Sequence, residues 1–385
     1  MSRFFDAHLD LACMAVLGRD MLASLEEINR EGGRVGPKPP AGVTLPALRE
    51  GGVRFALATI FLEPVAENGG GVNESRLSAE QYPAGDGAFA RRRARAQLEA
   101  YLTWQDRGLI SLNLSEVLRG DAGVGEVRAG MGVAEVVPQD IAAQIAARRG
   151  SASLVAGLLI EGADCIAGPD ELPEWIRRGL VAIGLTWARS SLYAAGNSVE
   201  PSDDFGLTPL GRCMIRAMDH HSVVHDLSHL SERSTRELLA ATDRPVMASH
   251  SNCRALLDGA EHPLMWQRHL SDETIREIGR RGGVIGLNLY AKFLTPERRR
   301  PTIDDALRHV ERICELMGHR RGVGLGSDMD GGFSALEMCE GIESPRDLAR
   351  LVDGLRDRGW SDRDIEGFSW RNWAEFFRRA LGHRP

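Results

Sequence analysis

Nine short apolar runs, most of them ending in a polar or charged residue, alternate with helix-like sequence along the 385-residue chain. They cover residues 4–10, 55–61, 110–114, 154–161, 180–187, 223–229, 245–250, 284–290 and 323–328. Buried strands that alternate with helices are typical of βα units around a parallel sheet. The run at 110–114 is short and is followed at once by a helix-start pattern at Ser115, so we leave it out. The remaining eight runs predict an α/β fold, the (β/α)8 or TIM barrel.

The same pattern predicts the helices and the loops. Helices are expected at 231–241 and 271–282, because Ser231 and Ser271 stand where a serine caps the first turn. Loop insertions are expected near 30–45, 68–86 and 194–209, which are irregular and follow predicted strands. With no internal repeat and no linker in view, we predict one barrel domain over residues 1–385.

Charge, cysteine content and hydropathy exclude several classes of protein. The formal net charge is -7, and the only basic runs are 91–93 and 298–300, so we expect no nucleic-acid partner. The six cysteines form no CxxC pair and no compact cluster, which favours a reduced, cytoplasmic chain. The first residues form no apolar leader and no run is long enough to span a bilayer, so we expect no membrane association.

Side chains that can bind metal stand at the ends of four predicted strands. His8 and Asp10 are two residues apart, so a continuous strand would point both the same way. Alone, such a pair is more often a hydrogen-bonded pair than a chelate. Glu161 ends an apolar strand, where an unpaired carboxylate is costly, and His229 and His250 end the fifth and sixth strands. Because barrel enzymes build their sites at these strand ends, the combination favours a metal centre.

The number of ligands fits two metal ions better than one. Catalytic sites commonly use three protein ligands per ion, and a shared Glu161 would give each ion three. Neither Lys38 nor Lys292 lies near that strand end, so a carboxylated lysine is not the bridge. Asp328 ends the eighth strand and could move a proton. We interpret Asp330 as a turn-stabilising aspartate before glycines.

His225 stands inside the fifth strand, where an apolar residue would be expected. The spacing of four predicts that it shares a strand face with His229. It is then either a hydrogen-bonding partner near the ligands or a core histidine satisfied by another group, and we favour the core histidine.

Several motifs in order along nearly the whole chain resemble the membrane (renal) dipeptidase family, the M19 metallopeptidases of the amidohydrolase superfamily. They are DAHLDL near the start, LPALREGGV at 45–53, LIEGAD, GLTPLGRCMIRAM before VHDLSHLS, PVMASHSN, GGVIGLNLY and GLGSDMDGG, with a degraded closing motif around Asn372. The resemblance implies a TIM barrel of the metallo-dependent hydrolase type, and it suggests a homodimer.

The resemblance also implies a set of roles. One ion would be held by His8, Asp10 and Glu161, and a second by Glu161, His229 and His250. Both ions would be zinc, with a bridging hydroxide as nucleophile, and Asp328 would be the proton shuttle.

Three further residues match substrate-contacting positions of the family. Arg268 matches the arginine that binds the substrate carboxylate. Without the resemblance, its sequence context would predict a surface side chain. Tyr290 either lines the site or packs at a strand end. Trp187 stands where the family has the histidine of a Leu-Thr-His motif that contacts the scissile carbonyl. Indole has one donor and no acceptor, and loss of one oxyanion donor typically slows a reaction ~10²–10³-fold.

We therefore expect a metal-dependent hydrolase of a small amide, namely a dipeptide or dipeptide-like molecule with a free carboxylate. One alternative is an amidohydrolase of the same fold that acts on a non-dipeptide amide or ester, because Trp187 would reshape the pocket. Another is a non-catalytic accessory protein that kept the barrel. Metal content separates the enzymes from the accessory protein.

Overall fold

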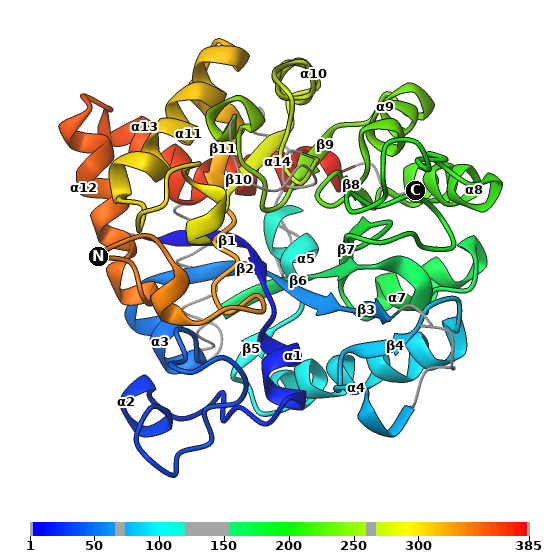
Figure 1. Ribbon diagram of the computed structural model, residues 1–385, viewed down its shortest axis with the longest axis horizontal. Coiled ribbons are helices and arrows are strands. Elements are labelled where there is room, and N and C mark those ends of the chain that lie inside the picture. The colour runs from blue at the N-terminus through cyan, green and yellow to red at the C-terminus, as the bar shows by residue number, and fades with distance from the viewer. Residues whose placement is uncertain (1–2, 66–73, 120–153, 259–266, 383–385) are drawn as a thin grey trace, which may run out of the picture.

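The computed structural model describes residues 3–65, 74–119, 154–258 and 267–382. Within these ranges, eight parallel strands close into a barrel (Figure 1). They are β1 (Phe4–Leu9), β2 (Val53–Phe61), β6 (Leu154–Glu161), β7 (Leu180–Gly184), β8 (Val224–Asp226), β9 (Val246–Ala248), β10 (Val284–Leu287) and β11 (Val323–Leu325). Each strand pairs with its neighbours in chain order, and pairing of β1 with β11 closes the ring. The predicted TIM barrel is confirmed.

The run at 110–114 is not a barrel strand, as predicted. Its only strand residues form β5 (Ile110–Ser111), which pairs with Leu154 and Val155 at the start of β6. Farther along, β6 pairs on one edge with β2 and on the other with β7. Both edges of β6 are therefore occupied by barrel strands, and β5 stays outside the ring.

Helices surround the barrel on the outside, as Figure 1 shows. They are α1 (Leu11–Val16), α2 (Leu25–Ile28), α3 (Leu45–Glu50), α4 (Gly87–Asp106), α5 (Leu114–Arg119), α7 (Leu172–Arg177), α8 (Pro209–His221), α9 (Glu232–Ala241), α10 (Asp272–Arg280), α11 (Ile303–Met317), α12 (Ala349–Asp357), α13 (Asp362–Glu366) and α14 (Asn372–Ala380). The predicted caps are confirmed, because the Ser231 hydroxyl accepts from the Ser234 N–H and the Ser271 hydroxyl accepts from the Thr274 N–H. No helix in the described ranges is both long enough and apolar enough to cross a bilayer.

Aromatic side chains from α14 close the end of the barrel where the strands begin. The Phe5 ring stacks on Phe377 with 5.7 Å between centroids, and the indole N–H of Trp373 donates to the Leu325 carbonyl over 2.9 Å. These side chains belong to one buried cluster with Phe55 and Val155, which lie near the starts of β2 and β6. The buried polar side chains His8, Glu161 and His250 lie at the opposite end of the barrel, where the strands finish.

The three predicted loop insertions differ from one another. Residues 31–44 contain no helix or strand. In the second region, β4 (Gln81–Pro83) pairs with β3 (Glu63–Val65), while residues 68–73 lie outside the described part of the chain. The third region is held by isolated bridges, Ala194 to Leu207 and Gly196 to Leu230. The extent of the domain, residues 1–385, stays a prediction.

Candidate metal centre

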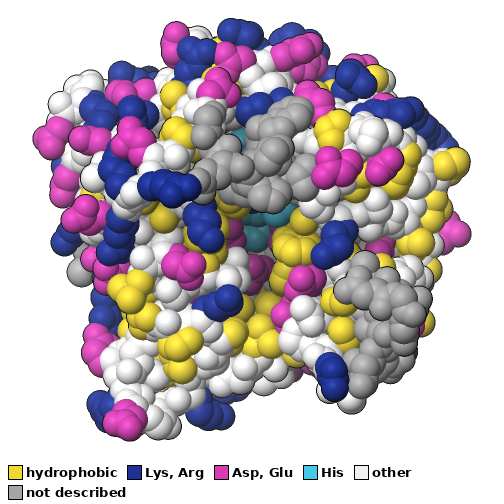
Figure 2. Space-filling view, viewed as in Figure 1, with side chains coloured by type: hydrophobic (Ala, Val, Ile, Leu, Met, Phe, Trp, Pro, Cys, Tyr) yellow, Lys and Arg dark blue, Asp and Glu magenta, His cyan; other side chains and the backbone are white. Residues whose placement is uncertain are grey.

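The five proposed ligands meet at the ends of the barrel strands, and we call them the ligand cluster. They are His8, Asp10, Glu161, His229 and His250, and all five are buried. Figure 2 shows histidine and acidic side chains at the bottom of a hollow in this face.

Glu161 lies at the centre of the cluster, at the end of β6. Its Oε1 atom is 3.1 Å from His229 Nε2 and 3.4 Å from His250 Nε2. Its Oε2 atom is 3.5 Å from His8 Nε2, which in turn is 3.8 Å from Asp10 Oδ1. The two carboxylate oxygens therefore face different members of the cluster.

His8 and Asp10 are close for a different reason from the one predicted. Strand β1 ends at Leu9, and Asp10 is the N-cap residue of α1. The register with β2 also shifts between Asp6 and Leu9, and Ala7 and Leu9 belong to different core clusters, although a regular strand would put both on one face. The predicted shared strand face is wrong. An irregular strand end and the turn into α1 bring the two side chains together.

His229 and Asp328 also leave their strands before they reach the site. Strands β8 and β11 end at Asp226 and Leu325, and the φ angles of His229 and Asp328 are 66° and 59°. Left-handed backbone at non-glycine residues costs about 1–3 kcal/mol and concentrates at functional sites. The strand ends thus bring His229 and Asp328 to the site, and the left-handed turns orient their side chains toward it.

The imidazoles of the cluster are neutral and present Nε2 toward Glu161. Burial lowers the pKa of His8 to about 3, and it lowers the pKa values of His229 and His250 well below the usual range. His229 Nδ1 is 3.1 Å from the Asn197 side-chain oxygen, an acceptor, so Nδ1 carries the hydrogen. The lone pair of His229 Nε2 then faces Glu161 Oε1 with no proton between the two atoms.

The unpaired acceptors fit a divalent cation. Asp10 Oδ1 and Glu161 Oε1 are buried, and neither has a hydrogen-bond partner among the described residues. Burial raises the pKa of both carboxyl groups, and so does their proximity to other carboxylates, including Asp328. Acceptors packed this closely repel one another unless a cation lies among them. A set of imidazole nitrogens and carboxylate oxygens suits zinc, manganese or cobalt.

Asp328 lies at the edge of the cluster and is placed to handle a proton. Its Oδ1 atom is 3.9 Å from His8 Nε2, and its Oδ2 atom accepts from the Asn288 amide over 2.9 Å. Burial raises the pKa of Asp328 to about 7, although Arg268 and the Asn288 hydrogen bond act in the opposite direction. Such a group exchanges protons readily near neutral pH. Asn288 was not predicted, yet it follows β10 as Asp10, His229 and His250 follow their own strands.

Arg268 is buried beside the cluster. Without the family resemblance, the sequence would have made it a surface residue, and that interpretation is wrong. Its Nη1 donates to Ser251 Oγ over 3.1 Å and its Nη2 to the His250 carbonyl over 2.8 Å. Its Nε is buried without a hydrogen-bond partner in the described ranges. Arg268 and His229 also line a small hollow, together with residues around the start of α9 and the segment before α10. The guanidinium thus retains an unused donor next to the cluster.

Trp187 lies beside the cluster, and Tyr290 packs against two other aromatic rings. The Trp187 ring is 6.0 Å from the His229 ring and makes an edge contact with Phe61, with 5.2 Å between centroids. Tyr290 stacks on Phe333 at 4.3 Å and meets Phe293 edge-on. These contacts agree with the packing alternative, and a place for Tyr290 in the site stays a prediction.

His225 and Asp330 have partners outside the cluster. His225 Nε2 is 2.7 Å from Asp219 Oδ1 on α8, so the interpretation as a core histidine is confirmed. The predicted strand face shared with His229 is wrong, because β8 ends between the two residues.

Asp330 forms an ion pair with Arg19 and accepts from the backbone N–H of Gly42 and Val43. Among the described residues, the Asp330 carboxylate therefore secures a distant loop, whereas only its backbone carbonyl bonds within its own turn, by accepting from the Gly332 N–H.

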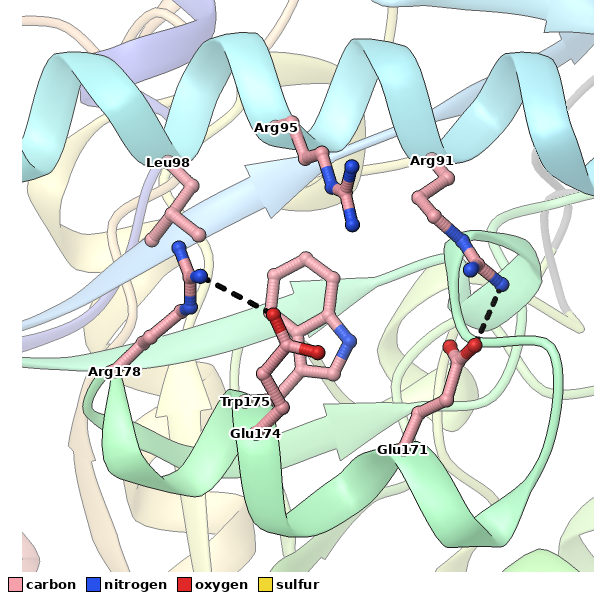
Figure 3. A pocket seen from close by; sticks show the side chains of 7 residues that line it. All are labelled: Arg91, Arg95, Leu98, Glu171, Glu174, Trp175 and Arg178. Carbon is pink, nitrogen blue, oxygen red and sulfur yellow. Dashed lines mark hydrogen bonds and ion pairs between the residues drawn. The ribbon is translucent and has the colours of Figure 1, made fainter.

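A second hollow lies on the outside of the barrel, between α4 and the segment formed by η3 (Pro169–Glu171) and α7 (Figure 3). It is lined by Arg91, Arg95, Leu98, Glu171, Glu174, Trp175 and Arg178. Arg91 pairs with Glu171 over 2.8 Å and Arg178 with Glu174 over 3.1 Å. It contains none of the predicted site residues.

Comparison with known sequences gives one family and several relatives. The family model described as membrane dipeptidase (peptidase family M19) matches residues 1–381. An uncharacterised dipeptidase of Schizosaccharomyces pombe is 28% identical over 58% of this chain and 53% of its own length. An uncharacterised protein from the pqqA 5′ region of Klebsiella pneumoniae is 30% identical over 57% of this chain and 80% of its own. Dipeptidase verJ of Clonostachys rogersoniana is 29% identical over 54% and 50%. The match thus spans about half the length of the two fungal relatives.

Solved structures share the fold across the whole chain. Dipeptidase AC, a metallopeptidase of family M19, superposes with a TM-score of 0.71 at 22% identity and 99% coverage of both chains. A metallopeptidase from Rhodobacter sphaeroides, solved with a phosphinate mimic of the dipeptide L-Ala-D-Ala, gives a TM-score of 0.69 at 21% identity and coverages of 98% and 99%. The probable dipeptidase PvdM from Pseudomonas aeruginosa gives 0.72 at 16% identity, with coverages of 99% and 96%.

Proposed function

Because the chain belongs to the M19 membrane dipeptidase family, we propose that it is a metal-dependent hydrolase of a dipeptide or a dipeptide-like amide with a free carboxylate. The observation that carries this proposal is the ligand cluster, in which buried side chains from three other parts of the barrel surround Glu161. Two of its acceptors, Asp10 Oδ1 and Glu161 Oε1, have no hydrogen-bond partner among the described residues.

The proposed centre contains two divalent ions, and zinc is the proposed metal. His8, Asp10 and Glu161 would hold one ion, and Glu161, His229 and His250 the other. The two oxygens of Glu161 support a shared ligand, since Oε2 faces His8 while Oε1 faces His229 and His250. When bound, the ions would supply Lewis acidity, which activates water and polarises the scissile carbonyl.

The protein's own residues would handle the proton and the substrate. Asp328 would take the proton from the attacking water and deliver it to the departing nitrogen, a role that suits a pKa of about 7. The buried guanidinium of Arg268 would bind the substrate carboxylate through donors that include its unpaired Nε. The dipeptide mimic bound by the Rhodobacter sphaeroides relative supports this substrate class.

Trp187 favours a second candidate, a hydrolase of a non-dipeptide amide or ester. The indole lies beside His229, with 6.0 Å between the ring centroids. It also cannot accept a hydrogen bond or become a cation as a histidine can. A substrate whose carbonyl needs less assistance, or whose shape fits the indole, would suit such a site.

Metal analysis combined with a substrate panel tests the proposal. We expect elemental analysis of the zinc-loaded chain to find two ions per chain, and Glu161→Gln to lose both. Hydrolysis of L,L- and L,D-dipeptides should stop with a chelator and return with zinc. A chain that binds no divalent metal would support the accessory role and refute the enzyme. Full metal loading without dipeptide turnover would leave the amide or ester hydrolase.

A further inference from the structure

One buried hydroxyl contacts two proposed ligands that come from different strands. Ser249 precedes His250, and its Oγ atom is 2.7 Å from His250 Nδ1 and 3.4 Å from His8 Nδ1. The two imidazole rings are stacked, with 3.6 Å between their centroids. Ser249 is fully buried, so bulk water does not compete for these contacts.

The hydrogen-bonding capacity of Ser249 matches its neighbours. A hydroxyl has one hydrogen and two lone pairs, so it can donate to only one of the two Nδ1 atoms. When both histidines bind metal through Nε2, both carry their hydrogen on Nδ1, and Ser249 Oγ accepts from both. Its own hydrogen then points away from the imidazoles, toward Ser228 Oγ at 3.4 Å or the Asp226 carboxylate, to which the Ser249 side chain also hydrogen-bonds. Each hydrogen-bonding position of the hydroxyl is used.

The backbone of Ser249 is fixed by three strands. Its N–H donates to Asp226 Oδ1, at the end of β8, over 2.9 Å. Its carbonyl oxygen packs against Gly286 of β10 and Gly326 just after β11, where an added Cβ at either glycine would overlap that oxygen. The hydroxyl is therefore held in place by the barrel itself.

We propose that Ser249 is a positioning residue shared by both metal-binding groups, holding His8 of one and His250 of the other with Nε2 toward Glu161. The proposal rests on the proposed function, in which these residues bind metal. The third imidazole is positioned separately, because His229 Nδ1 contacts the side chain of Asn197. Loss of the Ser249 hydroxyl should thus weaken both ions, whereas loss of the Asn197 amide should weaken one.

Three variants of the full chain test this difference by zinc affinity, measured through competition with a chromophoric chelator. Outer hydrogen-bond partners of metal ligands typically contribute about 10–100-fold in affinity. We expect Ser249→Ala to weaken both zinc ions by such a factor, and Asn197→Ala to weaken only one. Ser251→Ala is the matched control, because Ser251 is equally buried and contacts Arg268 and Ser228 but neither imidazole. Its zinc affinity should equal that of the wild type.

Two results with Ser249→Ala would overturn the proposal: wild-type affinity for both ions, or weakened affinity for only one. A measurement on the wild type covers the case in which the variant does not fold. In ¹⁵N NMR spectra of the zinc-loaded chain, the Nδ1 protons of His8 and His250 should be present and exchange slowly with solvent. A missing or rapidly exchanging Nδ1 proton on either residue would refute the shared role. Failure of the proposed function is distinct, because the wild type itself would then bind no zinc.

Discussion

At the scale of single residues, Trp187 separates this site from the family pattern on which its function is argued. By the resemblance, the indole stands where the family has a histidine; in the structure it contacts Phe61 and lies beside His229. The proposed ligands, the proton carrier and the carboxylate-binding arginine are unaffected by this replacement. By the resemblance, what changes is the group expected to contact the scissile carbonyl.

We therefore predict that Trp187→His raises the kcat for dipeptides about 10²-fold, because it restores a donor of the kind that contributes ~10²–10³ in rate. Steady-state kinetics on L,L- and L,D-dipeptides in the zinc-loaded chain measure this. Trp187→Phe is the control, since it enlarges the pocket without adding a donor and should give no comparable gain. Unchanged dipeptide turnover in Trp187→His would contradict our account of the replacement.

At the scale of elements, three of the strands that end at the site are short, and the segments after them approach one another closely. Strands β8, β9 and β11 each contain three residues. Gly286 and Gly326 allow the Ser249 carbonyl to lie against their backbones. The absence of side chains at these two positions thus helps to set the position of the ligand-bearing segment after β9.

Gly326→Ala should consequently destabilise the fold by about 1–3 kcal/mol, the usual effect of overpacking a close contact, and should lower zinc affinity because Ser249 must shift. Urea unfolding and chelator competition measure the two effects. Gly168→Ala is the control: its φ is -175° and an added Cβ meets nothing within 4 Å, so the free energy of unfolding should change by less than about 0.5 kcal/mol. Equal stability of the two variants would contradict the close approach.

At the scale of the whole molecule, a buried ion pair joins segments from the two ends of the chain. Asp330, after the last barrel strand, pairs with Arg19 and accepts from the N–H groups of Gly42 and Val43. Arg19 also donates to the Val35 and Val43 carbonyls. One carboxylate therefore secures the irregular loop before α3 to the rim of the barrel.

Asp330→Ala should lower the free energy of unfolding by about 3–5 kcal/mol, because it leaves the Arg19 charge buried without its partner. Urea titration followed by tryptophan fluorescence measures the change. Asp353→Ala removes one member of an exposed pair with Arg356 and should cost less than about 1 kcal/mol. If the two variants unfold at the same urea concentration, the pair does not secure the loop as described.

The sequence alone predicted the barrel, the exclusion of 110–114, the helix caps and the identity of the residues that gather at the site. Each of these features depends on a pattern among residues that are near one another in the sequence. Apolar runs of strand length alternate with helices, serines precede helical segments, and charged or imidazole side chains end apolar runs where burial without a partner is unfavourable. The homodimer, the cytoplasmic location and the absence of membrane and nucleic-acid partners stay predictions.

Only the tertiary structure decided how the site residues are aimed and what holds them. Local alternation failed at His8, His229 and Asp328, because the strands end early and the backbone turns. The partners Asn197, Ser249 and Asn288 could not be predicted, since they meet His229, His8 and Asp328 across 32, 241 and 40 residues of chain. Hydrogen bonds between distant segments depend on how the whole barrel closes, and a sequence pattern contains only what neighbours along the chain impose.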